Sequence, residues 1–90
     1  MQGSLDESSR RGSLEIVAQL LDASCHGVRK TELISRCNLS FLQFKKYLEL
    51  TLKANLIKLE NEEPYVLLKL SDKGKEFLKA YQHLKTLLEQ

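Results

Sequence analysis

The chain has 90 residues, of which 42% are hydrophobic and 29% charged, and its formal net charge is +2. This length fits one domain, and the composition is that of a soluble globular protein. No apolar run approaches the ~20 residues that span a bilayer, and the polar N-terminus lacks the apolar segment of a signal peptide. We therefore expect a cytoplasmic protein with no membrane partner.

The sequence offers no recognisable catalytic or metal site. Cys25 and Cys37 have no C-x-x-C spacing, and His26 and His83 are isolated along the chain. We interpret the cysteines as small buried hydrophobes, with a Cys25–Cys37 disulfide as the alternative. The sequence shows no nucleophile–base pair, glycine-rich phosphate loop or metal cluster, so we expect neither an enzyme nor a bound cofactor.

The N-terminal part predicts a tail and one helix. Residues 1–12 are rich in Gly, Ser and charges, which favours a flexible tail. Ser13 is a favourable N-cap for the first helix, and Gly27 is expected to end it. Residues 28–30 are long enough for only a single extended pairing. The apolar stripe of the first helix is Leu14, Val17, Leu20 and Leu21.

Two further helices are predicted on either side of a tight turn at residues 38–40. The second begins at Thr31 and ends at Asn38, a residue type that tolerates the left-handed conformation. Ser40 caps the third helix, which Asn55 is expected to close. At ~100° per residue, one arc of the third helix should pack inward. This arc comprises Phe41, Phe44, Tyr47, Leu48, Thr51 and Leu52.

Other residues of the third helix point away from that arc. Leu42, Leu50 and several polar residues are predicted to face outward, with Lys45 at the margin. In a helix-turn-helix, the first two turns of the second helix of the motif meet the base edges of DNA. Gln can pair with adenine, Lys can donate to guanine, and an apolar group can contact the thymine methyl. The predicted reading edge is therefore residues 40–46.

A β-hairpin follows directly. Residues 57–60 alternate as a half-buried strand should, residues 61–64 form the turn, and residues 65–70 return antiparallel. The turn, Asn-Glu-Glu-Pro, is acidic, whereas a wing that enters the minor groove usually carries Arg or Lys near its tip. Any phosphate contact is therefore expected from Lys58 and Lys69 on the flanks.

Ser71 is predicted to cap a last helix that continues to the end of the chain. Its apolar residues follow the 3-4 spacing of a helix–helix seam over about two heptads. Pairing with the same helix of a second subunit would cover the distal leucines, and the alternative is a helix folded wholly onto its own core. The expected dimer interface is Phe77, Ala80, Tyr81, Leu84, Leu87 and Leu88.

Charge is distributed unevenly along the chain. Residues 27–58 hold seven basic and two acidic residues, a balance of +5, whereas the remaining residues hold seven basic and ten acidic ones, a balance of −3. A basic segment in an otherwise acidic chain indicates one side that faces a polyanion.

Five stretches together resemble small archaeal winged-helix proteins, transcriptional regulators or chromatin-associated factors that carry a C-terminal dimerising helix. They are residues 11–16, RGSLEI; 30–33, KTEL; 38–41, NLSF; 45–50, KKYLEL; and 70–78, LSDKGKEFL. The resemblance implies a mainly α fold with a small β-hairpin, in the order helix, short strand, helix, helix, strand, strand, helix. It also implies a symmetric homodimer that binds double-stranded DNA in the major groove.

The expected organisation is a tail at 1–12, a winged helix-turn-helix domain at 13–70 and a dimerisation helix at 71–90. The alternative is a winged-helix module for an unidentified protein partner, which exposed Leu42 and Leu50 and the acidic wing would suit. The residues expected to contact DNA are Arg29, Lys30, Ser40, Phe41, Gln43, Lys45, Lys46, Lys53, Lys58 and Lys69.

Overall fold

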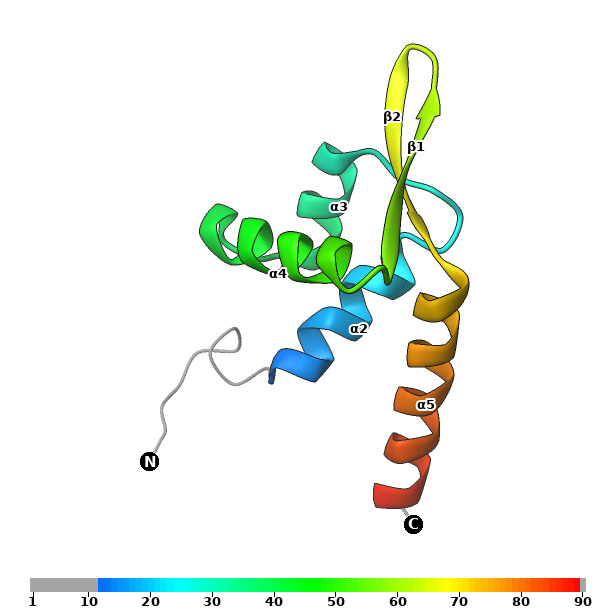
Figure 1. Cartoon of the computed structure of the whole chain (residues 1–90). Helices are drawn as coiled ribbons and strands as arrows, with labels where there is room; N and C mark the ends of the chain where they lie inside the picture. The colour runs from blue at the N-terminus through cyan, green and yellow to red at the C-terminus, as the bar shows by residue number, and fades with distance from the viewer. Residues whose placement is uncertain (1–11, 90) are drawn as a thin grey trace.

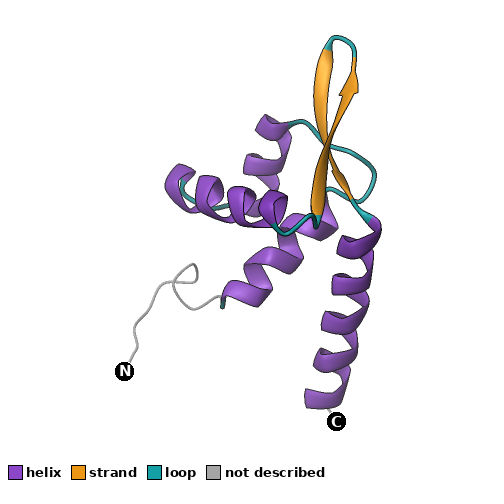
Figure 2. Ribbon diagram, viewed as in Figure 1, coloured by secondary structure: helices purple, strands orange, loops and turns teal. Residues whose placement is uncertain are grey.

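The computed structural model describes residues 12–89, so the predicted tail, apart from Gly12, lies outside the described residues. The described part confirms the predicted mainly α fold with one antiparallel hairpin (Figures 1 and 2). No helix in it is both long and apolar enough to span a membrane. The elements are α2 (Ser13–Ala23), α3 (Lys30–Cys37), α4 (Phe41–Lys53), β1 (Ile57–Glu62), β2 (Tyr65–Leu70) and α5 (Asp72–Leu88).

The first three helices pack together, while the hairpin and α5 extend from them in opposite directions (Figure 1). Helix α2 contacts α3, α4 and α5. The side chains of Leu20, Leu33 and Phe44 are fully buried where these helices meet. Cys37 is buried in this core and Cys25 is half-buried, and the alternative of a disulfide between them is not realised within the described residues.

The boundaries of the first two helices differ from those predicted. Gly12, not Ser13, occupies the N-cap of α2, and the Ser13 hydroxyl instead lies 3.1 Å from the Tyr47 hydroxyl. Helix α2 ends at Ala23, four residues before Gly27. Gly27 has φ +86°, a conformation that glycine adopts at little cost, and turns the chain toward α3. Helix α3 begins at Lys30, one residue before Thr31.

Two apolar residues predicted to face inward are exposed. Phe41 is 59% exposed because it lies in the first turn of α4, which extends beyond α2 and α3 (Figure 1). Leu14, in the first turn of α2, is 56% exposed. In both cases the helical periodicity gives the direction of the side chain but not the extent of the neighbouring helices.

The hairpin is longer than predicted, and only its base is buried. Strand β1 continues to Glu62, so the turn shortens to Glu63 and Pro64. Ile57 is buried, but Leu59 is 61% exposed, although its register partner Leu68 on β2 is buried. The single extended pairing predicted at residues 28–30 is confirmed. The Val28 N–H donates to the Leu68 carbonyl at 3.0 Å, and the Leu68 N–H donates back at 2.8 Å.

One junction holds the end of α4, the start of β1 and the start of α5 together. The Ser71 N–H and hydroxyl both donate to the Leu56 carbonyl at 3.0 Å. The same hydroxyl accepts from the Gly74 N–H at 2.9 Å, which confirms Ser71 as the N-cap of α5. Gly74 is buried so closely against Leu56 that any Cβ there would collide with the Leu56 carbonyl.

We predict that Gly74→Ala destabilises the protein although alanine is the better helix former. The added methyl group would force backbone to move, which typically costs about 1–3 kcal/mol. Urea unfolding of the variant and the wild type would measure this difference. Glu76→Ala, at an exposed site two residues further along α5, should change stability by less than about 0.5 kcal/mol. Unchanged or higher stability of Gly74→Ala would contradict the proposed steric constraint.

Candidate nucleic-acid interface

Helix α4 carries a continuous solvent-exposed face. Phe44, Tyr47, Leu48 and Thr51 are buried, and they fix which side of the helix meets the core. At ~100° per residue, the opposite side of the helix carries both charged and apolar residues. We call it the outer face of α4, and it consists of Leu42, Lys45, Lys46, Glu49, Leu50 and Lys53, all exposed.

The start of α4 is fixed by local capping. Asn38 adopts the left-handed conformation with φ 52° and ψ 48°, as predicted, and ends α3. The Ser40 hydroxyl accepts from the Gln43 N–H at 3.2 Å, which confirms it as the N-cap. It also lies 3.5 Å from the Gln43 side-chain oxygen, and Gln43 is half-buried. Ser40 and Gln43 are therefore engaged with each other at the edge of the outer face.

The end of α4 is fixed equally well. Asn55 has φ 62°, and its N–H donates to the Leu52 carbonyl at 3.0 Å. The Leu56 N–H donates to the Thr51 carbonyl at 2.9 Å. These two bonds form a Schellman motif with Asn in the position that glycine usually takes. The prediction that Asn55 closes the helix is confirmed, and its conformation is left-handed.

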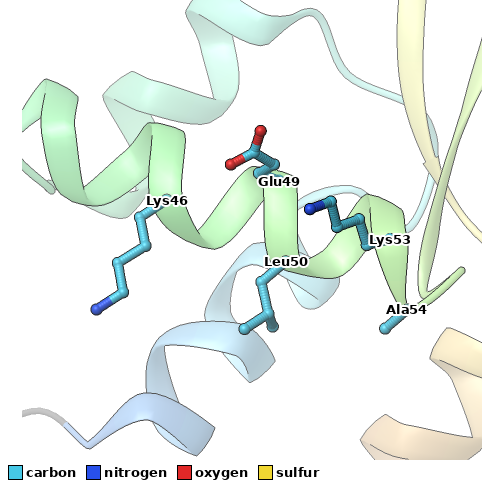
Figure 3. A pocket seen from close by; sticks show the side chains of 5 residues that line it. All are labelled: Lys46, Glu49, Leu50, Lys53 and Ala54. Atoms are coloured by element: carbon cyan, nitrogen blue, oxygen red, sulfur yellow. The ribbon is translucent and has the colours of Figure 1, made fainter.

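The C-terminal half of the outer face is hollowed (Figure 3). An open depression of about 460 Å³ is lined by Lys46, Glu49, Leu50, Lys53 and Ala54. It therefore combines two ammonium groups, one carboxylate and one exposed leucine. The reading edge predicted from the sequence, residues 40–46, does not include Glu49, although helical periodicity places Glu49 on the same face as the lysines.

The other predicted contact residues lie near the hairpin. Arg29 and Lys30 are exposed at the start of α3, and the Arg29 guanidinium lies 4.5 Å from the centre of the Tyr65 ring. This cation–π contact holds an otherwise flexible arginine beside β2. Lys58 pairs with Lys69 in the hairpin register, so both lie on one face of the ribbon.

The hairpin is not uniformly basic. The Lys69 ammonium lies 3.4 Å from the Glu60 carboxylate, and this ion pair partly neutralises it. The structure thus places the predicted residues in two groups. One is the outer face of α4 with its N-terminal edge, which also carries Phe41. The other, around α3 and the hairpin, comprises Arg29, Lys30, Lys58 and Lys69.

On the predicted seam of α5, Phe77 and Tyr81 are half-buried, whereas Ala80 and the three distal leucines are exposed. Phe77 is half-buried and lines an apolar hollow of about 280 Å³ between α2, α4 and α5. Tyr81 is half-buried and faces a groove against α2. The distal residues Leu84, Leu87 and Leu88 are 52%, 56% and 85% exposed. Within residues 12–89, no group of three His, Cys, Asp or Glu side chains could hold a metal ion.

Comparison with known proteins agrees with this architecture. Residues 10–89 match a family model described as winged helix-turn-helix. The fold is similar to Sso10a-2, a DNA-binding protein from Sulfolobus solfataricus, with a TM-score of 0.74 and 21% identity over 88% of this chain and 83% of that one. It is also similar to AF1382 from Archaeoglobus fulgidus, with a TM-score of 0.67 and 18% identity over 96% and 93% of the two chains.

A protein from Lactococcus lactis shares the fold as well. ZitR from Lactococcus lactis, solved in complex with DNA, gives a TM-score of 0.58 and 23% identity over 99% of this chain and 64% of that one. No protein of curated function matches the sequence. The family match and the archaeal neighbours confirm the resemblance that the sequence indicated.

We predict that Ser40→Ala lowers the free energy of unfolding by about 1 kcal/mol, because the first turn of α4 loses its cap. Ser40→Asp should retain wild-type stability, because Asp caps as well as Ser. Thermal unfolding of the three proteins would measure both effects. Equal stability of Ser40→Ala and wild type would show that the hydrogen bond to Gln43 does not hold the helix start.

Proposed function

Because this chain belongs to the winged helix-turn-helix family, we propose that it binds double-stranded DNA as a homodimer, with α4 in the major groove. The observation that carries the proposal is the outer face of α4, where Lys45, Lys46 and Lys53 are all exposed on one side of a helix capped at both ends. The biological role would be transcriptional regulation or organisation of the chromosome. Sso10a-2 is described as a DNA-binding protein, and ZitR was solved with DNA, which supports the same use of the fold here.

The charge pattern supports separate roles within the interface, with some residues contacting phosphates and others contacting bases. Lysine and arginine side chains fix the register by neutralising phosphates, whereas base edges are read by side chains that enter the groove. Lys58 and the Tyr65-stacked Arg29 are suited to phosphate contact beside the hairpin. The tip, with Glu62, Glu63 and Pro64, has no cation to place in a minor groove, so we assign it no contact.

The exposed end of α5 supports the dimer. Three leucines at the end of one helix would remain in water in a monomer, and soluble monomers rarely expose contiguous apolar surface of this kind. The opposite side of the same helix carries Lys75, Lys79 and Thr86, all exposed. A second copy of α5 would therefore cover the leucines and leave the polar side in solvent. The pairing would also set the distance between two α4 helices, ideally ~34 Å or one turn of DNA.

Replacing Lys45 and Lys46 together with alanine is expected to weaken duplex binding about tenfold or more without unfolding the protein. The slope of log affinity against log salt concentration should also become shallower, by about 0.9 for each lost phosphate contact. Fluorescence anisotropy with a labelled duplex across a salt series would measure both quantities.

The matched control is Lys75→Ala with Lys79→Ala, which removes the same charge from α5. This control should bind as wild type does. If the wild type binds no duplex at low salt, the DNA proposal fails. The exposed Leu42 and Leu50, 78% and 47% accessible, would then favour a protein partner instead.

The double substitution of Leu84→Glu with Leu88→Glu is expected to convert the dimer to a monomer. Duplex binding should then weaken at least about tenfold, because two linked sites bind more tightly than one. Sedimentation equilibrium would report the mass, and anisotropy the affinity. Thr86→Glu adds a carboxylate on the far side of the same helix and should leave both unchanged. A wild-type protein that sediments as a monomer at high concentration would exclude this interface.

A further inference from the structure

We propose that Glu49 gives this protein its sequence preference, by accepting a hydrogen bond from the exocyclic amine of cytosine in the major groove. The inference rests on the proposed DNA binding by α4 and adds a base-reading role for one side chain. It identifies the ligand of the hollow in Figure 3 as the edge of a C·G base pair.

Glu49 lies on the outer face of α4, between two lysines that line the same hollow. Its direction on the helix is opposite the buried side formed by Phe44, Tyr47 and Thr51, so it lies near the middle of the outer face. Lys46 lies one turn before it and Lys53 one turn after it, and all three side chains line the same hollow. A helix that places these lysines against DNA therefore places Glu49 against it too.

A carboxylate at this position is electrostatically unfavourable for non-specific binding of DNA. A carboxylate beside a phosphate backbone is repelled, so a surface meant only to hold DNA by charge would gain from a neutral residue here. Within the described part of the chain, Glu49 takes part in no ion pair, although Lys45 and Lys53 are each four residues away. The Glu49 carboxylate is therefore available to accept a hydrogen bond from a bound ligand.

The major groove offers such a donor at specific bases. Cytosine presents its N4 amine there, whereas guanine presents N7 and O6 and thymine presents O4, all of which are acceptors. Adenine presents its N6 donor next to the N7 acceptor, which would face the second carboxylate oxygen. A carboxylate consequently favours cytosine and leaves an unpaired charge against guanine or thymine. A good base contact of this kind discriminates by roughly tenfold or more.

This contact would extend the reading edge beyond residues 40–46. Leu42 lies seven residues before Glu49 and therefore points in nearly the same direction, ~10 Å away along the axis. Leu42 is 78% exposed and would meet bases first, while the flanking lysines reach phosphates on either side. The hollow at the C-terminal half of α4 then belongs to the same interface.

The test compares the sequence preferences of the full-length wild type with those of Glu49→Ala, Glu49→Gln and Glu76→Gln. Each protein is used to select duplexes from a randomised pool, and affinities are then measured for the selected duplex and its single-base variants. The wild type should select a position with cytosine and discriminate against other bases there about tenfold. Glu49→Ala should lose that preference, and Glu49→Gln should move it toward adenine, the base that glutamine pairs with.

Glu76→Gln changes the net charge as Glu49→Gln does, but at an exposed site on α5, and should leave the selected sequence unchanged. The inference is overturned if both Glu49 variants select the same sequence as the wild type and only bind every duplex more tightly. It is also overturned if the wild type binds duplex DNA without any selected sequence, a result that would leave the proposed DNA binding intact. Absence of all duplex binding would overturn both.

Discussion

The arrangement of the molecule depends on how three consecutive carbonyl groups at the end of α4 are satisfied. The Ala54 carbonyl accepts from the Lys73 ammonium at 2.8 Å, and the Ser71 hydroxyl shares its one hydrogen between the Asn55 carbonyl at 2.6 Å and the Leu56 carbonyl at 3.0 Å. The Leu56 carbonyl also accepts from the Ser71 N–H, and the Gly74 backbone packs directly against this carbonyl. Since all the donors come from the start of α5, the direction of α5 is tied to the end of α4.

This coupling has a functional consequence. In the proposed dimer, α5 meets a second subunit and α4 meets DNA, so the junction transmits the geometry of one interface to the other. The same carbonyls would otherwise be left unpaired at a helix end, where each needs a partner from a side chain, water or another segment. The hydrogen bonds that complete the end of α4 are therefore the same ones that fix the direction of α5 relative to α4.

Local chemistry explains why much of the fold could be predicted from the sequence. Asn38 and Asn55 adopt left-handed conformations, and Ser40 and Ser71 cap helices, because these preferences depend on a few neighbouring residues. The hairpin between α4 and α5 and the lysines on the outer face of α4 also follow from periodicity. Periodicity did not reveal that Leu14, Phe41 and Leu59 would be exposed, because exposure depends on where a neighbouring element stops.

The sequence by itself determined the order of the elements, the caps of α4 and α5 and the uneven distribution of charge, since each depends on residue type and short spacing. Only the tertiary structure decided that Gly74 must lack a side chain, that Arg29 stacks on Tyr65 and that Glu49 shares a hollow with two lysines. The first two bring together segments distant in sequence. The third follows from helical spacing, but the structure had to show that the face carrying Glu49 is left uncovered. The physical reason is that the approach of backbones and the coverage of a surface are set by packing, which no local pattern specifies.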